Sequence, residues 1–446
     1  MSADIATQVG DWLPTDQVYL ARWLDDLIGE VGEKSAAPGL QTRELADPLT
    51  VFREFVYANP EVYVLFTDMF EQLSQKVTPT GYPQVKSFEH MLQLLDKVLT
   101  TVPEYDTSGL VGFPINVILN WAMGTRAGFA AFLNKDVNQQ LKPVLDHWAE
   151  YLRSKDSQES MKAGGWLSDE ALNAMSDHNS EGEVETPFVD LFDCDQHDPY
   201  YGFDSWNSFF TRSLKDPDRH RPIAEEDDDD VIVSACEVSP YRLSRCVELY
   251  DHFSVKGQPY SLAHLLDTAH KSQDEPDDEY FKHGTVYQGF LKALNYHQWH
   301  SPVNGKVVAC RKIPGSYYSE TPATLCDPAA PDISQGYIAH VATRALIFIE
   351  AANEKIGTLC FVAIGMAEVS SCNLAVKPGD SVTKGQKLGE FQYGGSSHCL
   401  VFNPDVDLTF VPEVEEIDRD HPATIRVRAE LATVEQRVAN EPRPTR

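Results

Sequence analysis

The chain carries, near its C-terminal end, the stretch Lys377-Pro-Gly-Asp-Ser-Val-Thr-Lys-Gly-Gln-Lys-Leu-Gly-Glu-Phe-Gln-Tyr-Gly-Gly-Ser-Ser397. Its last four residues, from Gly394 to Ser397, are common turn material when taken alone. Taken alone, these residues therefore predict a plain loop.

A second group of polar residues lies upstream, in Tyr296-His-Gln-Trp-His-Ser-Pro-Val-Asn-Gly305. His297 and His300 are three residues apart, a spacing that can chelate zinc. No third ligand stands at an obvious spacing, so we predict no metal site. A pair of ordinary structural histidines, one buried and one exposed, is the alternative.

Around these two stretches, the C-terminal half has the pattern of a β-rich domain. Short apolar segments bounded by glycine, proline or charged residues predict strands at Val231–Val233, Lys306–Val308, Ala345–Ile349 and Leu359–Ile364. The fold class that follows is α+β, with a helical N-terminal domain before a β-rich catalytic domain.

The first part of the chain has helical periodicity. Apolar stripes predict helices from Leu20 to Val31, from Ser87 to Leu99 with Ser87 as N-cap, and from Leu141 to Leu152. The apolar stretch Gly109–Leu133 is interrupted by polar residues, so it predicts a buried helix or helix pair instead of a membrane span. We expect a helical domain over residues 1–155, a polar connector over 156–200 and the β-rich domain over 201–446.

Charge and cysteine content narrow the class of protein. The 446 residues carry 68 acidic and 37 basic side chains, a net charge of −31. Such a surface repels phosphate backbones and anionic lipids, so we expect neither nucleic acid nor stable membrane association. Eight cysteines without a Cys-x-x-Cys pair favour reduced thiols and a cytoplasmic protein.

Five stretches in the same order resemble the phosphatidylserine decarboxylase family. They are Ser205-Trp-Asn-Ser-Phe-Phe-Thr-Arg212 with Arg221-Pro-Ile223, Val255-Lys-Gly-Gln-Pro-Tyr-Ser-Leu262, Tyr296-His-Gln-Trp-His-Ser-Pro302, Gly385-Gln-Lys-Leu-Gly-Glu-Phe391 and Gly394-Gly-Ser-Ser397. The helical N-terminal region, the segment Asn120–Phe132 and the motif Gly365-Met-Ala-Glu-Val-Ser370 are similar to a fungal soluble subgroup of L-tryptophan decarboxylases.

The resemblance implies a self-processing enzyme. Ser396 would attack the carbonyl of Gly395, the chain would break between these residues, and Ser396 would become a covalent pyruvoyl group, the cofactor. That group would form a Schiff base with the substrate amine and accept electrons as the carboxylate leaves. By the same resemblance, His300 is the base for self-cleavage and His297 is the acid or base of decarboxylation.

Two departures from the family pattern bear on the site and the substrate. The family uses an aspartate to orient the base, and Glu237 stands at that position in Val233-Ser-Ala-Cys-Glu-Val238. Glutamate can accept the same imidazole hydrogen bond, so we expect Glu237 to orient His300, with a surface strand residue as the alternative. The family's Asn-Glu-Arg block is reduced to Ala342-Thr-Arg344, which argues against a phospholipid substrate.

The expected activity is decarboxylation of a free aromatic L-amino acid, above all L-tryptophan to tryptamine. A soluble phosphatidylserine decarboxylase is the first alternative. A non-catalytic module is the second, because Gly379–Leu388 resembles the turn of biotinyl or lipoyl carrier domains. Those carriers need an exposed lysine in a Met-Lys-Met or Asp-Lys-Ala hairpin tip, and neither motif is present here. A pyruvoyl site at a β-rich interface would suit a homodimer.

Overall fold

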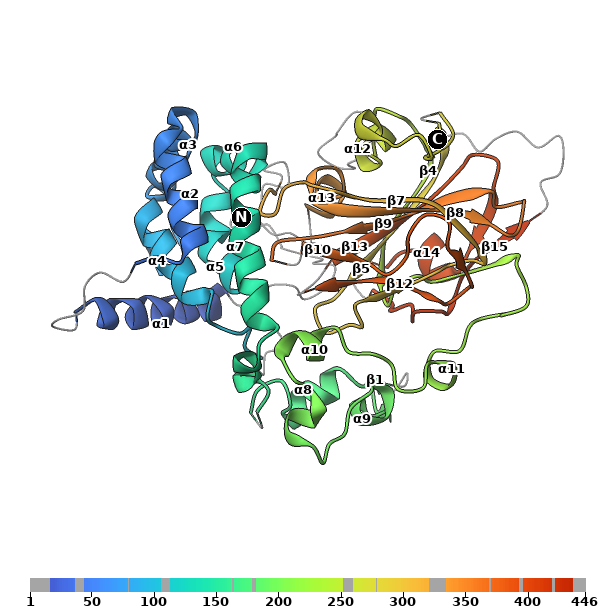
Figure 1. Ribbon diagram of the computed structural model, residues 1–446, viewed down its shortest axis with the longest axis horizontal. Helices are drawn as coiled ribbons and strands as arrows, with labels where there is room; N and C mark the ends of the chain where they lie inside the picture. The colour runs from blue at the N-terminus through green and yellow to red at the C-terminus, as the bar shows by residue number, and fades with distance from the viewer. Residues whose placement is uncertain are drawn as a thin grey trace.

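A computed structural model of the chain describes residues 17–36, 44–78, 80–105, 113–162, 164–178, 182–251, 260–277, 279–320, 334–368, 370–392, 396–418 and 422–435. Helices come first along the chain and strands dominate the second half, so the predicted α+β class is confirmed (Figure 1). The helices α2 to α7 stand together at one side of the β-rich part, and the short helices α8 to α11 lie below both.

The helical part has these bounds: α1 (Gln17–Ala36), α2 (Asp47–Ala58), α3 (Pro60–Leu73), α4 (Phe88–Val98), α5 (Pro114–Met123), α6 (Arg126–Leu133) and α7 (Lys135–Leu152). Side-chain oxygens of Asn59, Ser87, Thr125 and Asn134 cap the starts of α3, α4, α6 and α7. Each cap satisfies a backbone N–H that has no partner within its helix. The predicted N-cap Ser87 and the helix pair expected before Leu133 are thus confirmed.

Short elements connect the helical and β-rich parts. They are η1 (Lys155–Ser160), α8 (Asp169–Ala174), β1 (Asp177–His178), β2 (Val184–Thr186), α9 (Phe188–Leu191), η2 (Pro199–Gly202), α10 (Trp206–Phe210) and α11 (Pro217–His220). The indole of Trp166, between η1 and α8, lies against Trp206 and Phe209 of α10. This polar segment of sequence therefore contributes aromatic side chains to the core.

The largest described sheet has seven antiparallel strands in the order β11-β7-β8-β9-β13-β5-β4. Their bounds are β4 (Ser239–Val247), β5 (Gly284–Leu291), β7 (Gly305–Ile313), β8 (Arg344–Ala351), β9 (Thr358–Ile364), β11 (Ser381–Val382) and β13 (Ser396–Phe402). Every residue of β5 and β13 is buried. These central strands are covered on both faces, which explains their nearly continuous apolar sequences.

Smaller sheets and helices surround the seven-stranded sheet. Their bounds are β3 (Val231–Val233), β6 (Gln298–His300), β10 (Ser371–Leu374), β12 (Lys387–Gln392), β14 (Asp407–Phe410), β15 (Glu430–Glu435), α12 (Leu262–Leu265), η3 (Thr268–His270), α13 (Gln335–Val341) and α14 (Pro412–Glu415). The sheet β10-β12-β6 matters most for function. A Cβ atom at Gly389 of β12 would lie 2.5 Å from the Trp299 ring, so only glycine lets that indole pack on the strand.

The helical part contacts the β-rich part through α5, α6 and α7. The Tyr317 backbone N–H donates to Asn138 Oδ1 of α7 at 3.0 Å. The rings of Phe132 in α6 and Tyr318 lie 6.2 Å apart. The start of α5 is bound by the carboxylate of Glu368, which follows β9. No described helix is long and apolar enough to cross a membrane.

Candidate active site

Ser396 is the first residue of β13, between β9 and β5. It pairs with Leu291 of β5, and Ser397 pairs with Ile364 of β9. One step further in this register, Gly365 lies beside Ser396. The Ser396 side chain is fully buried, and its Oγ has no hydrogen-bond partner among the described residues. Gly395, the other residue of the predicted cleavage bond, lies outside the described residues.

Strand alternation decides which face of the sheet Ser396 occupies. Ser396 and His398 point to one face of β13, and Ser397 points to the other. The His398 ring is stacked on Phe361 of β9 with 5.5 Å between the ring centroids. Trp299 of β6 also packs on Phe361, at 5.5 Å. Ser396 therefore lies on the face that the small sheet β10-β12-β6 covers.

His300 points away from that face. Because Gln298, Trp299 and His300 alternate along β6, Trp299 faces the large sheet and His300 faces the opposite side. The His300 Nδ1 lies 2.7 Å from the Gly385 carbonyl oxygen, and Nε2 lies 2.9 Å from the Tyr296 hydroxyl. Burial lowers the pKa of His300 to about 4, which keeps the ring neutral. Its role as the base for self-cleavage stays a prediction.

The expected contact between Glu237 and His300 is not formed, and this part of the prediction is corrected. Arg221 binds the Glu237 carboxylate through Nε at 2.9 Å and Nη2 at 3.0 Å. The same guanidinium holds Asp177 at 2.7 and 2.8 Å. Both ring nitrogens of His300 already have other neighbours. Glu237 is therefore part of a buried ion-pair cluster, which raises the pKa of Arg221.

His297 and His300 lie opposite different residues of β12. The His297 carbonyl accepts from the Phe391 N–H at 3.0 Å. His300 pairs with Lys387, four residues earlier, or about 13 Å of strand. The His297 ring lies 4.3 Å from the Phe210 ring of α10. The two histidines of the motif thus have different neighbours.

Two buried groups at this site were not predicted from the sequence. His398 is fully buried on the Ser396 face, and neither ring nitrogen has a hydrogen-bond partner among the described residues. Burial lowers its pKa to about 3. Glu368 is also buried, and burial raises its pKa to about 7. Strand alternation after Ser396 could have revealed His398, and an acidic residue after an apolar strand could have drawn attention to Glu368.

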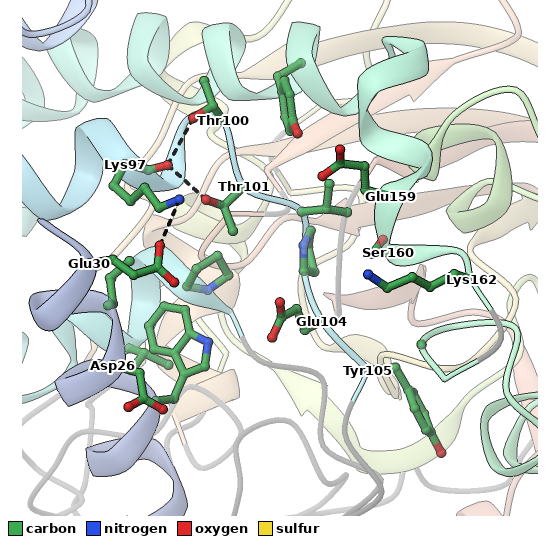
Figure 2. A pocket seen from close by; sticks show the side chains of 18 of the residues that line it. Asp26, Glu30, Lys97, Thr100, Thr101, Glu104, Tyr105, Glu159, Ser160 and Lys162 are labelled. Atoms are coloured by element: carbon green, nitrogen blue, oxygen red, sulfur yellow. Dashed lines mark hydrogen bonds and ion pairs between the residues drawn. The ribbon is translucent and has the colours of Figure 1, made fainter. Parts of the chain in front are cut away.

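Two sizeable cavities lie in the described part of the molecule, one beside the β-rich part and one in the helical part. One of about 490 Å³ opens on the connection from β5 to β6, with Arg212, Glu237, Lys292 and Tyr296 among its lining residues. The other, of about 580 Å³, lies in the helical part among α1, α5 and η1. Figure 2 shows the Lys97 ammonium of this second cavity directed at the Glu30 carboxylate, 3.0 Å away. Lys292, which lines the first cavity, directly follows Leu291, the residue of β5 that pairs with Ser396.

The described residues contain no group of three or more histidine, cysteine, aspartate or glutamate side chains placed to hold a metal ion. The residues described near Ser396 offer a buried hydroxyl, imidazoles and a carboxyl group. Such groups can supply a nucleophile and exchange protons.

Comparison with known proteins covers both parts of the chain. Two family models described as phosphatidylserine decarboxylase match residues 46–175 and 206–428. The L-tryptophan decarboxylase of Psilocybe cubensis is 34% identical over 91% of this chain and 90% of its own length. The decarboxylase iboD of Amanita muscaria is 37% identical over 72% of this chain and 95% of its own.

A phosphatidylserine decarboxylase of different length is also similar. Proenzyme 3 of Schizosaccharomyces pombe is 30% identical over 49% of this chain and 21% of its own length. The similarity to the shorter fungal decarboxylases therefore includes the helical part, whereas that to proenzyme 3 covers about half of the chain. Taken together with the ordered motifs around Ser396, these matches show that the chain belongs to the phosphatidylserine decarboxylase family and is a carboxy-lyase.

Proposed function

We propose that this enzyme cleaves itself between Gly395 and Ser396, carries the resulting pyruvoyl group at residue 396, and decarboxylates a free aromatic L-amino acid in the cytoplasm. L-tryptophan, giving tryptamine, is the proposed substrate. The observation that carries the proposal is the buried Oγ of Ser396 at the start of β13, which has no hydrogen-bond partner among the described residues. Nearly full-length similarity to the tryptophan decarboxylase of Psilocybe cubensis supports the choice of substrate.

Self-cleavage uses only groups of the chain itself. The Ser396 Oγ attacks the Gly395 carbonyl carbon, and the acyl group moves from the Ser396 nitrogen to its oxygen. Elimination of the resulting ester releases the Gly395 carboxylate and leaves dehydroalanine, which water converts to the pyruvoyl group and ammonia. A buried hydroxyl without a competing partner fits this role, because no hydrogen bond must be broken before attack.

Decarboxylation needs a binding group, an electron acceptor and a proton donor. The pyruvoyl ketone supplies a carbonyl that condenses with the substrate amine and withdraws electrons as the carboxylate leaves. His297 is the proton donor proposed by family resemblance, and its carbonyl accepts from the N–H of Phe391, five residues before Ser396. His300 is the base proposed by family resemblance, and in the described conformation its ring would have to leave Tyr296 and Gly385 to reach Ser396.

The neighbouring serines offer a matched test of self-cleavage. Ser397 faces the opposite side of β13, where its Oγ accepts from Gln288 Nε2 at 3.0 Å. We expect wild type and Ser397→Ala to run on a denaturing gel as two chains, 1–395 and 396–446, and Ser396→Ala to run as one. Cleavage of Ser396→Ala at this bond would contradict the mechanism.

The substrate is tested separately on the cleaved protein. Amine products are measured by liquid chromatography with L-tryptophan, L-tyrosine, L-phenylalanine and micellar phosphatidylserine as substrates. We expect tryptamine to form fastest and no turnover of the phospholipid. Turnover of phosphatidylserine without any aromatic amine would contradict the proposed substrate and leave the self-cleavage result intact.

A small-molecule substrate of this kind requires neither nucleic acid nor a membrane. Sedimentation would test the expected homodimer.

A further inference from the structure

The helical and β-rich parts meet close to Ser396, at the end of β9. Gly365 lies beside Ser396 in the register, and Glu368 follows three residues later, within about 10 Å of chain. Ala367 has a φ of +50°, a left-handed conformation that a residue with a Cβ rarely adopts. The Ser370 hydroxyl donates to the Ala367 carbonyl at 2.9 Å. This tight turn brings the Glu368 carboxylate to the start of α5.

Only one oxygen of that carboxylate has a described partner. Glu368 Oε1 accepts from the Asn116 backbone N–H at 2.7 Å, in the first turn of α5. Phe113, at the N-cap position, makes no side-chain cap, so Glu368 satisfies an N–H that the helix leaves unpaired. Glu368 Oε2 is buried and has no hydrogen-bond partner among the described residues. The bond to α5 uses Glu368 Oε1, and Glu368 Oε2 remains able to accept a hydrogen bond from a ligand.

Other polar side chains of α5 and of the chain before residue 320 are buried and have no hydrogen-bond partner among the described residues. The Asn116 side chain is 0% exposed, and neither its Oδ1 nor its Nδ2 is paired among the described residues. Tyr318 is 1% exposed with an unpaired hydroxyl, and burial, followed by the charge of Glu368, raises its pKa well above its usual range. Each such group lowers stability unless something binds it. Buried groups of this kind normally find a partner, whether protein, water or ligand.

We propose that Glu368, Asn116 and Tyr318 recognise the side chain of the amino-acid substrate, with Glu368 Oε2 accepting a hydrogen bond from a ring N–H such as that of indole. This inference rests on the proposed function of Ser396. A substrate whose amine is held at residue 396 can extend its side chain toward Glu368, since the two residues are separated by Gly365 and a short turn. Under this proposal α5 supplies one wall of the specificity site.

The chemistry of the cluster favours one class of side chain. Carboxylate and amide oxygens accept a hydrogen bond from a heteroaromatic N–H, whereas a plain phenyl ring would leave them unpaired. A phosphate group would also be disfavoured, because a buried carboxylate repels it at close range. The cluster thus selects for an indole and against both phenylalanine and an anionic phospholipid headgroup.

The main test compares Glu368→Gln with wild type on L-tryptophan and 1-methyl-L-tryptophan, which lacks the ring N–H. Glutamine keeps the volume and can still accept from Asn116, but it loses the charge. We expect wild type to prefer tryptophan by about 10- to 100-fold in kcat/KM, mostly through KM. Glu368→Gln should lose most of this preference. Glu350→Gln, an exposed position on β8, should behave as wild type.

A binding measurement and a second variant separate recognition from structure. Calorimetry with indole-3-propionate, which has no amine, should show at least about tenfold weaker binding to Glu368→Gln. Tyr318→Phe removes only a hydroxyl that has no described partner, so a purely structural role predicts no loss of stability and no change in KM. We expect its KM for tryptophan to rise while its thermal midpoint stays the same or increases, because an unpaired buried hydroxyl has been removed.

The outcomes distinguish this inference from the proposed function. If wild type decarboxylates tryptophan, and Glu368→Gln keeps the full preference over 1-methyltryptophan with unchanged binding of indole-3-propionate, the recognition site is wrong and the proposed function stands. An unchanged KM in Tyr318→Phe would remove Tyr318 from the site. If cleaved wild type produces no aromatic amine, the proposed substrate itself fails.

Discussion

The two ends of the candidate site differ in how completely their buried polar groups are paired. At one end, Arg221 binds Glu237 and Asp177 with four hydrogen bonds between 2.7 and 3.0 Å. At the other end, Glu368 uses one oxygen to cap α5 and leaves the second unpaired among the described residues. A fully paired carboxylate stabilises the fold, whereas a half-paired one can still bind a ligand. The first end fits a structural role, and the second fits the recognition role that we propose for Glu368.

Breaking the paired end should have the largest effect on stability. Arg221→Ala leaves two largely buried carboxylates without their cation, so we expect the free energy of unfolding to fall by about 3–5 kcal/mol. Urea denaturation in a Ser396→Ala background measures this on an uncut chain. Lys355→Ala is the control, since the Lys355–Asp230 pair is 39% and 41% exposed and should contribute at most about 1 kcal/mol. Equal losses in both variants would contradict the structural role.

The buried carboxyl of Glu368 should make the free energy of unfolding depend on pH. Burial raises the pKa of Glu368 from 4.5 to about 7, so the folded state favours the protonated carboxyl. The stability that the protonated Glu368 carboxyl contributes is fully present below pH 4.5 and is lost as pH rises through 7. We expect wild type to lose stability on the order of 3 kcal/mol relative to Glu368→Gln between pH 4.5 and 7.5. Parallel pH profiles for the two proteins would contradict burial of an ionisable Glu368.

His398 should give a smaller pH dependence of stability in the opposite direction, with stability lost as pH falls. Burial lowers the pKa of His398 from 6.5 to about 3, so stability is lost as pH falls below 6.5 and the unfolded chain takes up a proton. Between pH 6.5 and 5 this amounts to about 2 kcal/mol. His398→Leu should remove that part of the acid sensitivity in urea titrations, and His270→Gln, at an exposed histidine, should not. No difference between the variants would contradict the buried neutral ring.

The smallest expected effect is that of Glu237→Gln on the rate of self-cleavage. Because its carboxylate binds Arg221 and not His300, Glu237→Gln should cleave itself at the wild-type rate once folded. His300→Ala and His297→Ala, followed by gel densitometry over time, show which imidazole self-cleavage needs. A delay in Glu237→Gln as large as that in His300→Ala would restore the expected triad and show that the described conformation changes before cleavage.

Much of the fold could be predicted from local sequence. The apolar stripes around Leu24 and Leu145 and the cap at Ser87 depend on neighbours within a turn or two, so they predicted α1, α7 and α4. The strands at β7, β8 and β9 were predicted in the same way. The order of motifs also singled out Ser396 and the histidine pair, because these residues are close together within short segments.

The pairings within the site were not predictable in this way. The Arg221–Glu237 ion pair joins residues 16 positions apart, and the bond from Asn116 to Glu368 spans 252 positions. Which face of β6 carries His300 depends on how the small sheet packs against Phe361. Sequence alone indicated the helices and strands, which follow from local pattern, and its ordered resemblance to the family pointed to Ser396 as the predicted cleavage residue. Only the tertiary structure decided which polar groups meet, since partners distant along the chain are chosen by the packing of sheets and helices.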